Sequence, residues 1–129
     1  MATQTDPTGT NIAEQYDLSN ATKPAVYALV SVTTTATSLA SLLSAAGAAA
    51  IPTWPNAMAF LTPESAVGAL AVRYRCDGVA PVGGVWGSGG GQPIFGGQSW
   101  PLQGLPDLGA LQLISATGAT VPLSVEFRG

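Results

Sequence analysis

Apolar and polar residues alternate most clearly along residues 69–81, and this stretch predicts a β-strand that ends in a turn. Apolar side chains occupy every second position of its first part: Leu70, Val72, Tyr74 and Cys76. A period of two is typical of a half-buried strand whose other residues lie on the opposite face. Asp77-Gly78 then predicts the turn, because Asp can hydrogen-bond its own backbone and Gly adopts positive φ without strain.

Residues 24–37 form the first expected strand, because β-branched residues favour a pleated backbone. One face of this strand carries four small or β-branched apolar side chains: Val26, Ala28, Val30 and Val32. The other face carries Tyr27 and Leu29. We therefore expect protein to cover both faces of the first part of this strand.

A further strand is expected over residues 56–62, with Met58 and Phe60 pointing inward, and a short one around Trp100. These stretches are separated by clusters of Gly, Pro and Ser, which are the usual residues of turns. The regular spacing of such clusters favours many short strands over long helices.

The end of the chain predicts two more strands, over residues 110–115 and 120–128. Residues 105–109 precede them and are expected to form a turn, because they combine Pro, Asp and Gly. Pro122 has no backbone donor for a sheet, so the last strand either lies at an edge or begins there.

Residues 38–47 change from a strand period to a helical one. Their apolar residues follow the i, i+3, i+4, i+7 spacing of one helix face: Leu39, Leu42, Leu43 and Ala46. Ser38 precedes them as a candidate N-cap and Gly47 follows as a stop signal. A short helix that packs its Leu stripe on a sheet is expected, since so short a helix does not persist alone.

Together these elements predict an all-β protein: a β-sandwich or small jelly roll of about 6–8 short strands with one short helix. Residues 24–129 are expected to form this single domain, and residues 1–23 to form an extended N-terminal arm. The arm shows no sustained period, and its anchors are Ile12, Tyr16 and Leu18. It is interpreted either as a disordered tail or as an arm that orders on a neighbouring subunit.

The composition is unusual for an isolated soluble domain, because 47% of residues are hydrophobic and only 9% are charged. We expect other protein to cover part of the surface, although Ala, Gly, Ser and Thr could also make a neutral, weakly polar surface. A net charge of −3 speaks against nucleic acid as the main ligand. No apolar run reaches the roughly 20 residues that span a bilayer, and the first residues do not resemble a signal peptide.

The chain lacks the residues on which most catalytic and metal sites depend. It contains no His and one Cys, and its seven acidic residues are scattered, so we expect neither an enzyme nor a bound cofactor. The glycine-rich residues 83–91 are followed by Pro93 and not by a helix, which argues against a phosphate-binding loop.

Interface candidates are the arm anchors together with three residues further along the chain. Arg73 and Arg75 either bind an anionic partner surface or pair internally with Glu126. Trp86, in the glycine-rich loop, either anchors in a neighbouring subunit or packs on its own sandwich. Phe95 is expected to pack on its own sandwich.

Three segments resemble small virion proteins of tailed bacteriophages. They are the SLxxLLxxAG pattern of residues 38–47, the RYRxDGxAP pattern of residues 73–81, and LQLISATGATVPLSVEFR at residues 111–128. The DGxAP turn is the most distinctive, and the likeness covers about the last two thirds of the chain. The long glycine-rich loop and the N-terminal extension depart from the simpler pattern.

This resemblance implies a head decoration (cement) protein without enzymatic activity, located on the capsid exterior of the virion after synthesis in the host cytoplasm. The implied partner is the major capsid protein, with homo-oligomer or self-contacts on the capsid, and with neither nucleic acid nor membrane. The alternative is a head-fibre or tail-associated module that binds a receptor or glycan. Three tryptophans could stack on sugars in that case: Trp54, Trp86 and Trp100.

Overall fold

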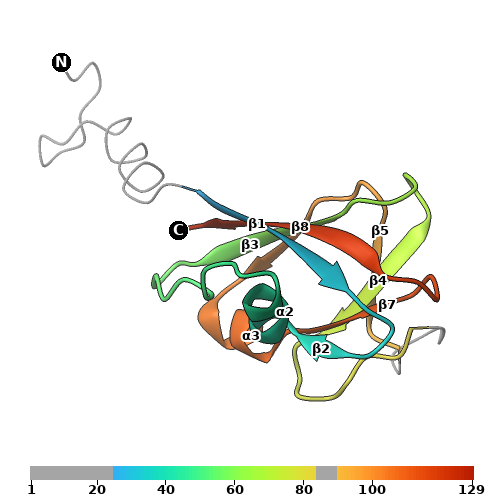
Figure 1. Ribbon diagram of the computed structural model, residues 1–129. Coiled ribbons are helices and arrows are strands. Elements are labelled where there is room, and N and C mark those ends of the chain that lie inside the picture. The colour runs from blue at the N-terminus through green and yellow to red at the C-terminus, as the bar shows by residue number, and fades with distance from the viewer. Residues whose placement is uncertain (1–24, 84–89) are drawn as a thin grey trace, which may run out of the picture.

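The computed structural model describes residues 25–83 and 90–129, and these residues form two antiparallel sheets of four strands each (Figure 1). The predicted all-β sandwich is therefore confirmed. The first sheet has the order β1 (Val26–Val32), β8 (Val121–Arg128), β3 (Met58–Pro63) and β6 (Trp100–Gln103). The second has the order β2 (Thr37–Ser38), β7 (Gln112–Ser115), β4 (Leu70–Arg75) and β5 (Gln92–Phe95).

The long strands β1 and β8 pair along their lengths and supply alternate side chains to the core. The buried residues are those that the period of two predicts: Val30, Val32, Val121, Leu123, Val125 and Phe127. β8 lies between β1 and β3, so it is an interior strand and the edge alternative for it is wrong. Pro122 is its second residue, which fits the other alternative, a strand that begins there.

The predicted helix is confirmed as α2 (Leu39–Ala45). The Ser38 side chain accepts a hydrogen bond from the backbone N–H of Ser41 at 3.1 Å, which satisfies one of the helix's free donors. Three leucines of the predicted stripe are buried: Leu39, Leu42 and Leu43. Gly47, with φ of 68°, ends the helix in the left-handed conformation that glycine tolerates best.

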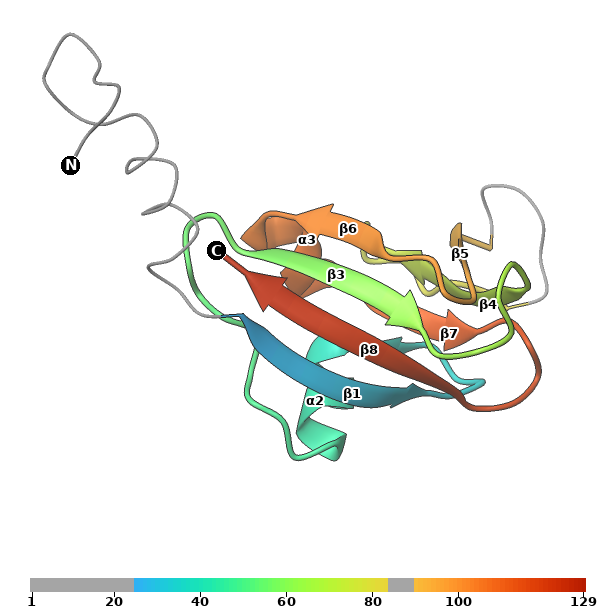
Figure 2. The same cartoon turned by 90° about the horizontal axis from the view of Figure 1, so that it is seen from above.

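A second helix, α3 (Leu105–Ala110), replaces the turn expected at residues 105–109. Gly104 starts it with φ of 100°, and a proline lies in its first turn, where no intrahelical donor is needed. The fully buried Leu108 fixes the helix to the core, and this tertiary contact overrides the local turn preference. Helices α2 and α3 contact each other and the strands of the first sheet, and cover its inner side beyond the short strands of the second sheet (Figures 1 and 2).

Two predictions for the first sheet are wrong, one about the inward face of β3 and one about the end of β1. In β3 it is Ala59 and Leu61 that are fully buried, whereas Met58 and Phe60 lie half-buried on the outer side. Small side chains suit the inner face where the helices pack closely, so residue size misled the prediction. The first strand also ends at Val32, and residues 33–36 connect it to β2 of the second sheet instead of extending it to residue 37.

Candidate functional site

The outer face of the first sheet is a surface that the sequence analysis did not anticipate. We call "outer face" the outward side chains of β1, β8, β3 and β6. One row across it consists of Tyr27, Glu126, Phe60 and Pro101, and the next of Leu29, Ser124 and Thr62. Met58 and Pro122 extend it at either end.

Tyr27 and Leu29 are the most exposed apolar residues of this outer face, at 67% and 62% of their surface. The expectation that both faces of β1 are covered is therefore wrong for the described residues. The inward side chains of the same strand are buried or half-buried, so the exposed pair belongs wholly to the outer side. Its apolar surface is available to another molecule.

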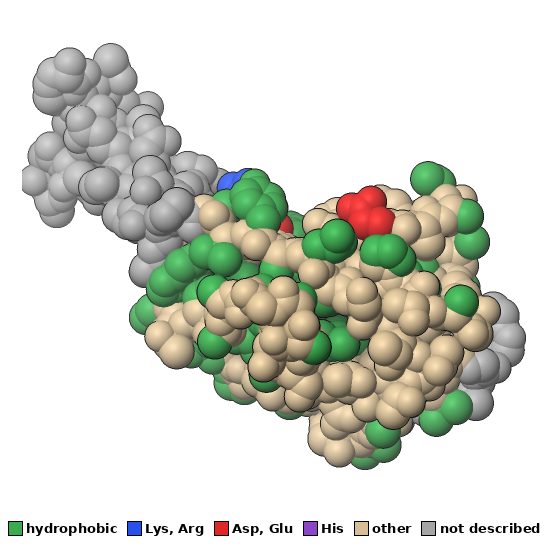
Figure 3. Space-filling model, in the orientation of Figure 1, with side chains coloured by type: hydrophobic (Ala, Val, Ile, Leu, Met, Phe, Trp, Pro, Cys, Tyr) green, Lys and Arg blue, Asp and Glu red, His purple; other side chains and the backbone are tan. Residues whose placement is uncertain are grey.

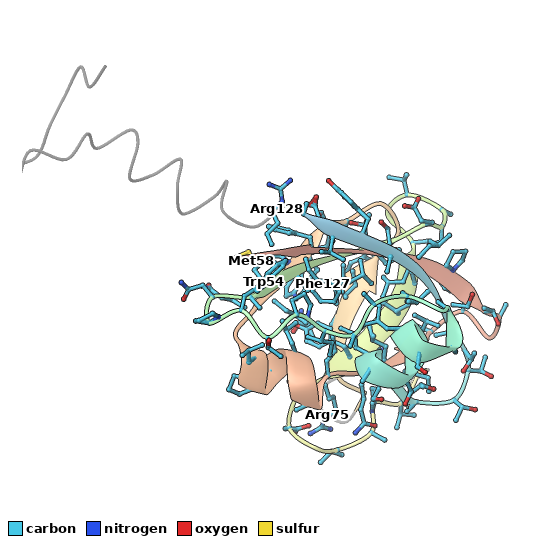
Figure 4. All side chains as sticks on the ribbon, turned by 60° about the vertical axis from the view of Figure 1, so that its left-hand side comes forward. Trp54, Met58, Arg75, Phe127 and Arg128 are labelled. Atoms are coloured by element: carbon cyan, nitrogen blue, oxygen red, sulfur yellow. The ribbon has the colours of Figure 1, made fainter. Side chains whose placement is uncertain are left out.

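Charge on the outer face is confined to one neighbouring pair on β8. Arg128 Nη2 donates to Glu126 Oε2 at 3.1 Å, and Figure 4 shows Arg128 on the outer side of the sheet. This arginine holds the pKa of Glu126 below its usual range, and the pKa of Arg128 is raised in return. The nearby Glu126 carboxylate raises the pKa of Tyr27 above its ordinary value.

Few charges interrupt the surface elsewhere. In the view of Figure 3 the charged side chains occupy small areas at the upper margin, and the remaining described surface is hydrophobic or uncharged. Such a surface favours contacts that depend on shape and apolar burial over contacts that depend on charge.

Arg75 lies on the other side of the molecule from Arg128 (Figure 4) and forms an ion pair with Asp77. The Arg75 guanidinium lowers the pKa of Asp77 to about 2. Asp77 also accepts from the backbone N–H of Val79, which fixes the predicted turn. Internal pairing of Arg75 or Arg73 with Glu126 is wrong, because Glu126 belongs to the other sheet and pairs with Arg128.

Arg73 has a structural role that the sequence did not reveal. Its side chain is only 2% exposed, although it points away from the core. Its Nη1 donates to the carbonyl oxygen of Gly91 at 3.0 Å, and its Nε donates to that of Gly83 at 3.4 Å. Arg73 therefore holds both ends of the glycine-rich loop against β4.

The two glycines at these ends are required by close approach to the sheet. A Cβ on Gly83 would lie 2.5 Å from the carbonyl oxygen of Ser115. A Cβ on Gly91 would lie 2.6 Å from that of Tyr74, and Gly91 also has φ of +94°. The N–H of Val82 donates to the carbonyl of Gly90 at 3.1 Å, so the loop leaves and returns at one point.

Several predicted interface residues lie outside the described part of the chain. They are Ile12, Tyr16 and Leu18 of the N-terminal arm and Trp86 of the glycine-rich loop. Their roles at an interface stay predictions. Of the predicted set, the structure thus places Arg73 and Arg75, both on β4 and both engaged by groups of this chain.

Two of the tryptophans proposed for sugar stacking pack against the core. Trp54 lies beside Phe127 and Met58 at one end of the sandwich (Figure 4) and is half-buried. Trp100 is also half-buried, and its Nε1 donates to the Tyr74 hydroxyl at 2.6 Å. Both rings are therefore partly covered by the chain's own core.

The corner formed by β5 and the residues before β4 exposes two further apolar side chains. Phe95 is 38% exposed, so it packs on its own sandwich only in part. Val67 is 90% exposed. Gly96 lies against the carbonyl oxygen of Ala66 beneath them, where a Cβ would not fit.

The described residues offer little reactive chemistry. Cys76 is half-buried, and burial raises the pKa of its thiol to about 11, so it is a weak nucleophile near neutral pH. Among these residues no group of three or more His, Cys, Asp or Glu side chains could hold a metal ion. The described helices are also too short to cross a membrane.

Comparison of the chain with protein-family models, with curated proteins and with solved structures finds no match. The three segments that resemble phage virion proteins correspond to α2, to the end of β4 with its turn, and to β7 followed by β8. Each of them builds the framework of the sandwich. The two most exposed apolar residues of the outer face lie on β1, which is outside these segments.

Proposed function

We propose that this chain is a decoration (cement) protein of a tailed-bacteriophage head, which binds the outside of the major capsid protein lattice and bridges neighbouring subunits. The observation that supports it best is the outer face, where Tyr27 and Leu29 are exposed beside a single neutralised charge pair. A protein that works alone in solution gains nothing from such a surface. A protein whose surface is completed by neighbouring subunits gains binding free energy when that surface is buried.

The physical role of a cement protein is to add interface across the joints of a shell. A standard contact buries about 1,600 Å² in total, and its free energy is repeated at every copy. Internal DNA pressure must then break these contacts before the lattice opens. The rigid sandwich suits this role, because ordering it on the shell costs little conformational entropy.

The alternative function, binding of a receptor or glycan from a head fibre or tail, receives less support. Sugar recognition by stacking needs exposed aromatic faces, whereas Trp54 and Trp100 pack against the core. The most exposed aromatic residue of the outer face, Tyr27, lies next to the Glu126–Arg128 ion pair on the neighbouring strand.

The test is binding of the purified chain to heads of the encoding phage that were assembled without it. Co-sedimentation measures binding, and the temperature at which the heads release DNA measures reinforcement. The double variant Tyr27→Ser, Leu29→Ser should bind at least about tenfold more weakly, because it removes the two most exposed contacts of the outer face.

A matched control removes the same kind of surface elsewhere. Val67→Ser with Val79→Ser replaces side chains that are 90% and 51% exposed at other places on the sandwich. This control should bind like the wild type. Heads that resist heating equally with and without the chain would exclude the cement role, and equal weakening by both double variants would exclude the outer face.

A further inference from the structure

The four edge strands of the sandwich differ in how well they are protected against pairing with another chain. β2 has two residues, while β5 and β6 have four residues each and contain Pro93 and Pro101. Short length and proline are the usual means of blocking an edge. β1, at the edge of the first sheet, has seven residues and contains neither proline nor a charged side chain.

The surroundings of β1 favour a single extended segment as its partner. Figure 2 shows β1 along the margin of the first sheet, and α2 contacts β1 from the inner side (Figure 1). Pairing of β1 with β1 of a second copy would bring two α2 helices together beneath the joined strands. One extended segment avoids this conflict and still satisfies the backbone groups of the edge.

A segment of suitable length precedes β1 directly. Residues 1–24 lie outside the described structure and lead into Val26, the first residue of β1. The residue before a proline prefers an extended conformation, and here the pair is Lys23-Pro24. This preference favours a chain that continues beyond the start of β1 over one that reverses tightly onto the edge of its own β1.

The apolar residues of this segment match what the edge exposes. Ile12, Tyr16 and Leu18 are separated by even numbers of positions, so an extended backbone places all three on one face. On β1 the exposed apolar side chains are Tyr27 and Leu29, also on one face. Aromatic and aliphatic side chains opposite each other stabilise neighbouring strands.

We propose that residues 12–18 of a second copy pair antiparallel with β1, with Tyr16 opposite Leu29 and Leu18 opposite Tyr27. The exchange is reciprocal, so two copies form a two-fold dimer held by their N-terminal segments. Residues 19–25 span about 23 Å when extended, which carries the segment from one copy to the edge of the other. This dimer concerns only the chain itself and does not depend on capsid binding.

The test uses the full chain with the double substitution Tyr16→Cys, Leu29→Cys. Opposite residues of paired strands are close enough for a disulfide. After mild oxidation, a denaturing gel without reductant should show a species of twice the 12.9 kDa chain mass. Light scattering of the unmodified chain should give the same doubled mass. The wild type, which keeps Cys76, sets the background for oxidation.

A matched control is Tyr16→Cys, Ser124→Cys. Ser124 lies on β8 opposite Leu29 of β1, so it is one strand further from the edge. This control should not form the linked dimer. A monomer-sized product with an internal disulfide would overturn the exchange in favour of pairing within one chain. A wild-type monomer, the absence of any disulfide, or equal linkage in the control would each overturn it as well.

The outcome is separable from that of the proposed function. A dimer that ignores phage heads leaves this inference standing and removes the cement role. If heads bind a chain that light scattering shows to be monomeric, the cement role stands and the dimer is overturned.

Discussion

Arg73→Met is the substitution that most directly tests how the glycine-rich loop is held. Methionine preserves much of the buried stem of the side chain and removes the guanidinium. The carbonyl oxygens of Gly83 and Gly91 then lose the donors that lie at 3.4 and 3.0 Å. The loop ends would remain pressed against β4 by close packing, but without these hydrogen bonds.

The expected loss follows from the two contacts. A hydrogen bond to a charged group contributes about 1.5–3 kcal/mol to stability. The longer hydrogen bond, from Arg73 Nε to the carbonyl of Gly83, is expected to contribute less than this range. Since Arg73 is 2% exposed, solvent replaces the lost donor poorly. We expect the free energy of unfolding to fall by about 3 kcal/mol. For a chain of this size that corresponds to a melting temperature lower by about 10 °C.

Urea unfolding followed by tryptophan fluorescence measures this change, and an unaltered slope would show that the unfolded state is the same. Arg75→Met is the matched control, because Arg75 lies on the same strand and pairs with the exposed Asp77. An ion pair at the surface contributes little, so the control should lose only a small part of what Arg73→Met loses.

Equal losses in the two variants would refute this reasoning. So would a more stable Arg73→Met protein, since buried charges can cost more in desolvation than they return. Hydrogen exchange adds a local readout. The Val82 amide, which closes the loop on Gly90, should exchange faster in Arg73→Met and unchanged in Arg75→Met.

Three other features of the fold can each be tested by substitution. Gly91→Ala should lower the free energy of unfolding by about 2 kcal/mol or more, because φ is +94° and the new Cβ meets a carbonyl oxygen. Gly109→Ala in α3, where a Cβ meets nothing within 4 Å, should raise the free energy of unfolding by about 0.5–1 kcal/mol. Thermal unfolding measures both changes. Ser38→Ala should cost about 1 kcal/mol through loss of the N-cap, while Ser44→Ala, exposed in the same helix, should cost nearly nothing. Asp77, whose pKa is lowered from 3.8 to about 2, stabilises the fold above pH 4 and loses this contribution as the pH falls towards 2. Asp77→Asn should remove that part of the acid dependence, and an unchanged pH profile would contradict the role of its ion pair.

The parts of the fold that the sequence predicted are those where local chemistry and tertiary packing agree. In β8, strict alternation places Val121, Leu123, Val125 and Phe127 in the core, as expected. In α2 the N-cap, the Leu stripe and the stop at Gly47 all coincide with the observed helix. Such agreement lets a short pattern specify both the element and its buried face.

The errors arise where a neighbouring element decides the outcome. Residues 105–109 have turn chemistry, yet the burial of Leu108 draws them into α3. β3 carries apolar residues on both faces, so its pattern could not say which face is inner, and side-chain size suggested the wrong one. The strand pattern marks Arg73 as exposed, whereas it is buried because Gly91, 18 residues further along the chain, accepts its hydrogen bond.

The outer face was hidden in the sequence for a related reason. Apolar residues on both sides of β1 predict a strand that is covered twice, and the chain supplies a cover for only one side within its described residues. Composition suggests that other protein completes the surface, and periodicity suggests that both faces of β1 are buried. Both inferences hold together if another molecule in an assembly covers the outer face of β1. The described arginines contribute little to such an assembly through charge, since Arg75 and Arg128 are matched by acidic neighbours and Arg73 is enclosed by the loop. What remains for recognition is apolar area beside an open strand edge, and a partner must supply extended backbone, apolar side chains or both.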